Sequence, residues 1–211
     1  NRIYFAMDSI PVFTVDAYTS KPFRGNPGCV VLLERDQMLS EGVKQKIAAE
    51  MNLAETAFVT KLSPNDDFKT SDKFLLCCFS PVSEMPQCGH ATMSAAVVLF
   101  TFLGNKAMSI EFVTKQSNII AKREGERIKL ISPILTPVQT DKFSDLVNYC
   151  AGSLDVGEVL YQPEKKMLII RLKDGYSLSL LQHQVIQPAA LLEMHDGSSV
   201  QAVVITLREE C

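Results

Sequence analysis

Alternating apolar and polar positions predict a series of short strands in the first two thirds of the chain. Residues 10–18 (IPVFTVDAY) alternate with a period of about two and are rich in β-branched and aromatic side chains, a pattern typical of strands. Glu124-Gly125 predicts a hairpin turn between two of the later strands. Comparable apolar runs predict strands over 29–33, 53–60, 74–79, 109–114, 118–123 and 127–131.

An amphipathic helix is predicted between residues 41 and 51. Ser40 is a suitable N-cap, and Asn52 is a suitable stop. We expect one face of this helix to be apolar and to carry Val43, Ile47, Ala48 and Met51. We expect the opposite face to point outward and to carry Lys44, Lys46 and Glu50.

A second helix is predicted over residues 90–103, and its composition differs from that of the first. Its residues are apolar almost all round, with small side chains near the start and Gly104 as a C-terminal stop. A helix without a polar face belongs inside a fold. We therefore expect a sheet to wrap around it.

The prolines Pro133 and Pro137 bound a predicted linker, after which a second set of elements begins. Thr140 is expected to cap a short helix that ends at Gly152, and Pro188 to open another that runs through Met194. Many short strands with few helices indicate an α+β fold. We predict two domains, 8–132 around the buried helix and 138–211, with strands in the second over 159–161, 167–172 and 200–207.

Charge and hydropathy argue against several classes of protein. The 211 residues include 21 Lys and Arg against 24 Asp and Glu, and no window gathers the basic residues into a stripe, so nucleic-acid binding is not expected. The longest apolar stretch, 95–103, is about half of the ~20 residues that span a membrane, so no membrane span is expected. No secretory signal pattern is visible at the N-terminus. We therefore expect a soluble, cytoplasmic protein.

The six cysteines are irregularly spaced, which favours reduced thiols over a disulfide framework. Cys77 and Cys78, taken with Cys88 and His90, suggest a zinc site by residue type. Adjacent cysteines do not easily ligate one ion, and the usual CxxC spacing is missing. No bound metal is therefore expected.

Glu55 is the first candidate for chemistry because the alternation of the predicted strand places it on the same apolar face as Ala57 and Val59. Burial without a cation would disfavour its charged form, and a carboxyl group so placed can shuttle a proton near neutral pH. The alternative is a glutamate at a sheet edge that points to water.

The segment Cys88-Gly89-His90 begins the predicted buried helix and is the second candidate. The first amides of a helix lack carbonyl partners and can hold a carboxylate or phosphate, and Gly89 lets a ligand approach the backbone. Cys88 at a helix start could itself act as an acid or base. The alternatives are a buried thiol at Cys88 and a His90 side chain bonded to a carbonyl.

Three segments in order resemble the PhzF family, and its animal branch in particular. They are Asp16-Ala17-Tyr18 with Phe23–Pro27 (FRGNP), Met51–Phe58 (MNLAETAF) and Pro86–Thr92 (PQCGHAT). The resemblance implies a diaminopimelate-epimerase-like fold, in which two similar halves each curve a sheet around a central helix. The active site of such a protein lies between the halves.

The resemblance also implies roles for particular residues. Glu55 matches the glutamate that moves a proton on a small carboxylate-bearing metabolite without a cofactor. His90, with Gly89 and Ala91, matches the part that holds the substrate. Cys88 falls near the catalytic thiol of other epimerases with this fold and ranks second as an acid or base. A homodimer is implied as well.

Two departures from the family pattern shape the hypotheses. Ala54 stands where the family commonly has Ser, and no Asp-Pro-x-Thr-Gly-Ser-like motif occurs in residues 138–211, so the second half is expected to be incomplete and the chain alone inactive. An isomerase that uses Glu55 is the leading hypothesis. The alternatives are a catalytically inactive scaffold with a binding or regulatory role, and epimerisation through the thiol of Cys88.

Overall fold

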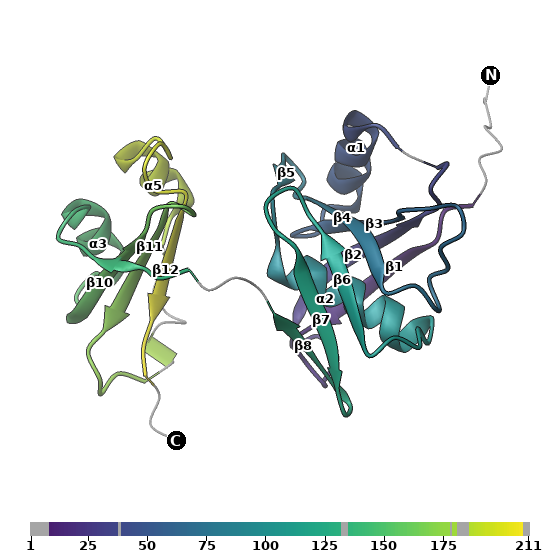
Figure 1. The fold of residues 1–211 in the computed structure, drawn as a ribbon. Helices are drawn as coiled ribbons and strands as arrows, with labels where there is room; N and C mark the ends of the chain where they lie inside the picture. Colours follow the sequence, from purple (N-terminus) through teal and green to yellow (C-terminus); the bar gives the residue numbers. More distant parts are fainter. Residues whose placement is uncertain (1–8, 38, 132–134, 178, 181–185, 209–211) are drawn as a thin grey trace. The chain divides into compact units, whose positions relative to one another are not determined.

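The chain forms two compact units, residues 1–133 and 134–211, which are described separately. The structure is a computed structural model and describes residues 9–37, 39–131, 135–177, 179–180 and 186–208 (Figure 1). Within these ranges no helix is long and apolar enough to cross a membrane.

The first unit is built on one mixed sheet that curls around a helix. The strands lie in the order β1-β2-β3-β4-β6-β7-β8, and β5 pairs with β4. The pairs β2/β3 and β4/β6 are parallel, and the other neighbours are antiparallel. The bounds are β1 Val12–Ala17, β2 Asn26–Leu33, β3 Thr56–Lys61, β4 Lys73–Phe79, β5 Glu84–Met85, β6 Ser109–Val113, β7 Ile119–Glu124 and β8 Arg127–Ile131.

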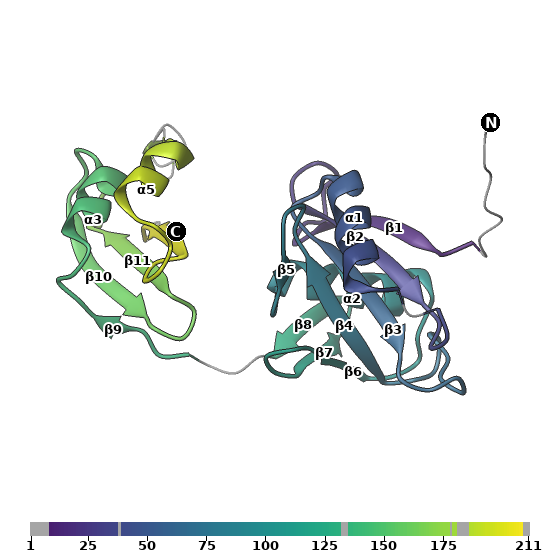
Figure 2. The ribbon, with the colours of Figure 1, turned by 90° about the horizontal axis from the view of Figure 1, so that it is seen from above.

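Helix α2 (Gly89–Val97) lies inside the curl of this sheet (Figure 2). It contacts β1 at one end of the strand order and β8 at the other, as well as β2, β3 and β7 between them. Ala91, Ala95 and Ala96 are completely buried, and these small side chains let the helix approach the strands closely. The prediction of a buried helix wrapped by sheet is confirmed.

The prediction of one continuous helix over 90–103 is wrong in its last turn. From Val98 to Phe102 the backbone is a π-helix, in which the Leu103 N–H donates to the Val98 carbonyl at 2.9 Å. Arg123 of β7 explains where the helix ends, because its guanidinium donates to the carbonyls of Phe100 and Asn105 at 2.8 Å each. A side chain distant in sequence thus satisfies one carbonyl of the π-helix, that of Phe100, and one in the loop that follows it, that of Asn105.

Helix α1 (Glu41–Met51) packs on the other face of the sheet and begins and ends where its caps predict. The Ser40 hydroxyl accepts from the Val43 N–H at 3.3 Å, and Asn52 adopts a left-handed conformation at φ 50°. The predicted inward face is wrong at two positions. Val43 is 40% exposed, whereas Lys44 is only 6% exposed.

The buried face of α1 has the spacing i, i+3, i+4, i+7, beginning at Lys44 and continuing through Ile47, Ala48 and Met51. This is the regular spacing of a core-facing stripe. The prediction placed Lys44 on the outward face because lysine is polar. Its long alkyl chain instead runs into the unit and carries the amine over the Phe58 ring, 5.9 Å from the ring centroid.

The second unit has a sheet in the order β12-β11-β10-β9, with β11/β12 parallel. Its core gathers buried side chains of α3 and β11, including Leu146, Leu168 and Ile170. The predicted cap at Thr140 is wrong, because α3 begins at Ser144 after Phe143, which has φ 66°. Pro188 does open α5, as predicted. The bounds are β9 Val138–Gln139, α3 Ser144–Ala151, β10 Val156–Gln162, β11 Met167–Leu172, α5 Pro188–Met194 and β12 Ala202–Thr206.

Candidate active site

Glu55 lies immediately before β3 rather than within a strand. The predicted strand over 53–60 begins only at Thr56. Its first five residues are all buried, on whichever face of the sheet they lie, so the alternation of the strand does not determine where the Glu55 side chain points. Its backbone is held beside β2 because its carbonyl accepts from the Cys29 N–H at 3.1 Å. Glu55 is therefore held at the N-terminal end of β3, beside the parallel strand β2.

Cys88 and His90 are placed by the first turn of α2. Cys88 is the N-cap residue, with an extended backbone at φ −140°, and its carbonyl accepts from both the N–H and the hydroxyl of Thr92. Gly89 follows as the first helical residue and is exposed. His90 comes next and turns its ring back toward Cys88.

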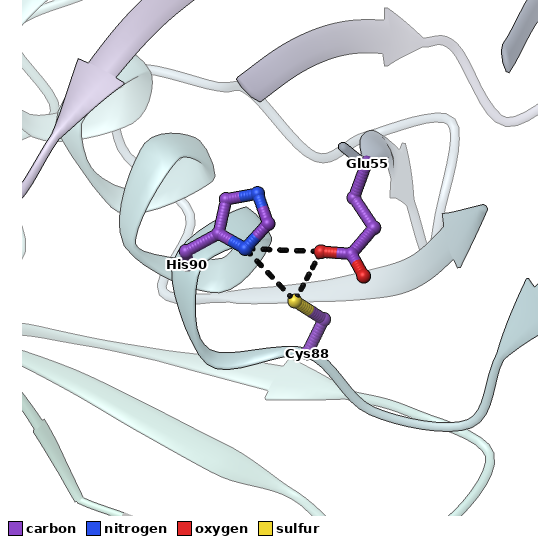
Figure 3. Close-up of side chains that lie close together, drawn as sticks. All are labelled: Glu55, Cys88 and His90. Carbon is purple, nitrogen blue, oxygen red and sulfur yellow. Dashed lines mark hydrogen bonds and ion pairs between the residues drawn. The ribbon is translucent and has the colours of Figure 1, made fainter. Parts of the chain in front are cut away.

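The side chains of Glu55, Cys88 and His90 converge on one point (Figure 3). The Cys88 thiol donates to Glu55 Oε2 at 2.6 Å, and His90 Nδ1 lies 3.0 Å from the same oxygen. Cys88 Sγ and His90 Nδ1 are 3.3 Å apart. One carboxylate oxygen therefore meets both a thiol and an imidazole, and both contacts hold the carboxyl group in place.

Burial first, and then the hydrogen bond to Glu55, raise the pKa of Cys88 to about 12, although hydrogen bonds from the backbone amides of Ala91 and His90 act in the lowering direction. A carboxylate stabilises the protonated thiol because the thiol donates to it, whereas a thiolate would repel it. At neutral pH Cys88 is thus a hydrogen-bond donor rather than a nucleophile. The cluster presents a carboxylate as its basic group.

Two further polar atoms lie beside the cluster without a partner among the described residues. They are His90 Nε2 and Ser94 Oγ, which are buried and one helical turn apart on α2. Gly28 of β2 packs against them, since a Cβ there would lie 3.0 Å from Ser94 Oγ and 3.6 Å from His90 Cδ2. The absence of a side chain at Gly28 therefore lets β2 approach the helix at the site.

Sequence reasoning missed Tyr18, which follows β1. Tyr18 is 62% exposed, has φ 64°, and lies beside the first turn of α2, because a Cβ on Gly89 would be 3.5 Å from its hydroxyl. Burial of the hydroxyl and the nearby charge of an ionised Cys88 raise the pKa of Tyr18. It also lines a cavity of about 480 Å³ with Met93, Val97 and Arg127. The available signal was its place in the Asp16-Ala17-Tyr18 motif.

Asp16 is the other residue that sequence reasoning left without a role. Its carboxylate Oδ2 accepts from the backbone N–H groups of Arg24 and Gly25 at 3.2 Å each. Gly25 has no room for a side chain, since a Cβ would lie 2.2 Å from the Ala17 carbonyl oxygen. Asp16 thus shapes the loop that leads into β2 and Gly28.

The donor set for a metal differs from the one considered from the sequence. Glu55, Cys88 and His90 bring one donor atom each within 4.8 Å of one another, and these donor types suit Zn²⁺. Cys77 does not join them, because its sulfur lies instead beside Lys44. The close contacts among the three side chains are already satisfied by hydrogen bonding and ion pairing.

The predicted site residues are thus partly brought together. Glu55, Cys88 and His90 meet, and Gly89 lies beside them at the helix start. Ala91 is completely buried, so its side chain is not accessible at the site and only its backbone can contribute there. A curled mixed sheet around a central helix is the arrangement of the epimerase-like α+β class.

Comparison with known proteins identifies the family. The family model described as phenazine biosynthesis-like protein (PhzC-PhzF) matches residues 15–207, and the chain belongs to this family. The bovine phenazine biosynthesis-like domain-containing protein is 40% identical over 203 residues, which cover 95% of this chain and 70% of the relative. An uncharacterized isomerase of Pseudomonas aeruginosa is 32% identical over 161 residues, 76% of this chain and 57% of that protein.

A solved structure shows the same fold. The crystal structure of a putative phenazine biosynthesis PhzC/PhzF protein from Clostridium difficile superposes with a TM-score of 0.74 at 27% identity, covering 96% of this chain and 70% of the other. The predicted family and the predicted α+β, epimerase-like fold are confirmed.

Proposed function

We propose that the protein is a cofactor-independent isomerase or epimerase in which Glu55 moves a proton on a small carboxylate-bearing metabolite. Membership of the family, and the isomerase name of the Pseudomonas relative, support an isomerase-like scaffold. The observation that carries the proposal is the engagement of one Glu55 oxygen, Oε2, by both Cys88 and His90.

This arrangement divides the two carboxylate oxygens between two tasks. Among the described residues the hydrogen bonds to Glu55 reach Oε2 and none reaches Oε1. Oε1 is therefore the atom that takes a proton from a substrate carbon and returns it elsewhere, while the contacts to Oε2 fix the direction in which Oε1 points. Such a positioned acid or base contributes about 10²- to 10⁴-fold to a rate.

The first turn of α2 supplies the complementary charge for the substrate. Gly89 is exposed at the N-terminus of this helix, where backbone N–H groups carry a partial positive charge. A substrate carboxylate bound there would lie next to the Glu55 cluster. Tyr18 adds a hydroxyl group beside the same turn.

The thiol alternative is less well supported by the geometry. Proton abstraction by Cys88 needs a thiolate, and the raised pKa of about 12 disfavours that form. The homodimer and the cytoplasmic location stay predictions. The inactive scaffold stays the alternative to catalysis, and it predicts that ligand binding survives the loss of both Glu55 and His90.

The test is exchange of substrate hydrogens with solvent. The purified natural protein is incubated in D₂O with a panel of small amino, hydroxy and unsaturated carboxylates, and deuterium uptake at carbon is followed by NMR. We expect uptake by at least one compound, and its loss in Glu55→Gln without a change in thermal unfolding. Glu50→Gln, a change at an exposed position of α1, is the matched control. Equal exchange rates for Glu55→Gln and the parent would reject the assignment.

A further inference from the structure

A lysine and a cysteine meet on the face of the sheet that packs against α1. Lys44 Nζ lies 3.7 Å from Cys77 Sγ, and the two residues are 33 positions apart in the chain. Lys44 belongs to α1 and Cys77 to β4, so the contact joins a helix to the strand beneath it. It involves neither Glu55 nor His90.

The environment of Lys44 is unusual for a charged side chain. Lysine is rarely buried unless a carboxylate accompanies it. Lys44 is 6% exposed, and within the described ranges its amine contacts only the Cys77 sulfur and the face of the Phe58 ring. Among the described residues, the amine of Lys44 is therefore paired with a thiol and not with a carboxylate.

Cys77 is more exposed than its neighbour Cys78, and a thiol must be accessible in order to react. Alternate residues of a strand point to opposite faces, and Cys78 is buried at 2% exposure in the core around α2. Cys77 packs against the α1 side and is only partly buried. A small oxidant can therefore reach Cys77 more readily than Cys78, because oxidation of thiols follows exposure.

We propose that Cys77 and Lys44 form a covalent sulfur–nitrogen cross-link when the protein meets hydrogen peroxide. In the first step the Cys77 sulfur attacks a peroxide oxygen, the O–O bond breaks, and the products are a sulfenic acid and one water. In the second step the Lys44 nitrogen attacks that sulfur and forms an S–N bond. The S–O bond breaks, and the departing hydroxide takes one proton from the nitrogen and leaves as water. A lysine that begins as an ammonium first gives its additional proton to solvent. The sulfur is oxidised, the peroxide is reduced, and the pair of side chains loses two hydrogens in total.

The geometry favours this product over free sulfenic acid. Sulfenic acids condense with nearby thiols or nitrogen atoms, and the amine of Lys44 already lies in contact with the sulfur. The lysine side chain is flexible enough to close the remaining distance. The product would attach α1 to β4, and thiol reductants would release it.

The experiment compares the protein before and after treatment with hydrogen peroxide, by mass spectrometry of peptides prepared without reductant. We expect the peptide of α1 that contains Lys44 to be joined to the peptide of β4 that contains Cys77, with a mass two hydrogens below their sum. Dithiothreitol should separate the two peptides. The parent chain needs no variant for this measurement, so the result does not depend on whether a substitution disturbs folding.

Three variants identify the partners. Cys77→Ala and Lys44→Met should abolish the cross-link, whereas Cys78→Ala, at the neighbouring thiol, should retain it. In Lys44→Met the sulfenic acid has no amine to attack it, so labelling of Cys77 by dimedone should rise several-fold over the parent. Absence of joined peptides in the parent, with dimedone labelling of Cys77 equal to that of Lys44→Met, would overturn the proposal. Failure here leaves the role of Glu55 untouched, because deuterium exchange does not involve this pair.

Discussion

His90 Nδ1 lies 3.0 Å from Glu55 Oε2, and the two side chains are only 11% and 14% exposed. One residue lies on the first turn of α2 and the other just before β3, so their contact joins the N-terminus of the helix to the N-terminal end of that strand. The pair does two things at once, because it positions the carboxylate and also stabilises the fold around it.

Replacing His90 by Ala should therefore lower the stability of the first unit. Glu55 would keep its partly buried charge with Cys88 as its remaining partner, and a hydrogen bond to a charged group contributes about 1.5–3 kcal/mol. Chemical unfolding should show this loss of free energy. His195→Ala in the second unit is a control that leaves this contact intact. A His90→Ala protein as stable as the parent would mean that Glu55 does not depend on the imidazole.

The reactivity of Cys88 should depend on pH in a characteristic way. With a pKa of about 12, its thiol is protonated through the range in which an ordinary cysteine, of pKa 9.0, already ionises. Alkylation of Cys88 by iodoacetamide should therefore keep rising with pH above 9, instead of reaching a plateau.

Glu55→Gln should increase alkylation of Cys88 at pH 8, because it removes a carboxylate that favours the protonated thiol. Peptide mass spectrometry follows Cys88 and Cys77 in the same samples. A rate for Cys88 that levels off near pH 9 would contradict the geometry of the thiol–carboxylate contact.

Gly28→Ala should disturb the site through packing. The new methyl group would lie 3.0 Å from Ser94 Oγ, closer than most such contacts, while α2 and β2 are both held by the surrounding sheet. Overpacking of this kind costs about 1–3 kcal/mol. Gly42→Ala on α1 is the matched control, since a Cβ there meets nothing within 4 Å and alanine favours helix. Thermal unfolding should separate the two variants, and equal midpoints would show that β2 can retreat from the helix.

Arg123→Ala should weaken the end of the central helix. It removes two hydrogen bonds, to the carbonyls of Phe100 and Asn105, and a cation–π contact with the Phe100 ring at 4.7 Å. We expect a loss of about 1–3 kcal/mol in the free energy of unfolding, and faster amide hydrogen exchange at Leu103. Lys122→Ala, at the exposed neighbouring position, should have little effect. An unchanged rate of amide hydrogen exchange at Leu103 would mean that the π-helix does not need the Arg123 guanidinium.

Local signals in the sequence correctly predicted the ends of those helices whose ends depend on neighbouring residues. Ser40 and Asn52 mark the ends of α1 because a hydroxyl cap and a left-handed residue act within one turn. Pro188 opens α5 for a similarly local reason. Thr140 failed as a cap because its hydroxyl accepts from the Lys142 N–H instead, in a turn that precedes the helix.

The burial of Lys44 and the π-helix Val98–Phe102 did not follow from the polarity of the residues. Lys44 occupies a regular core position of α1, and only the sulfur and ring beneath it accommodate the long side chain. At the end of the π-helix, the carbonyl of Phe100 accepts a hydrogen bond from Arg123, which reaches it from β7. Both outcomes come from contacts between residues distant in sequence.

The sequence by itself determined the α+β class, the buried helix and the identity of Glu55, Cys88 and His90 as residues of interest, because periodicity and motifs are local properties of the chain. It did not determine that Cys88 and His90 share one oxygen of Glu55, that Tyr18 lies beside Gly89, or that Lys44 faces Cys77. These pairings depend on how the sheet curls around α2 and on which face of α1 packs against it. Curvature and packing arise from the sum of many contacts across the unit, so only the tertiary structure decided them.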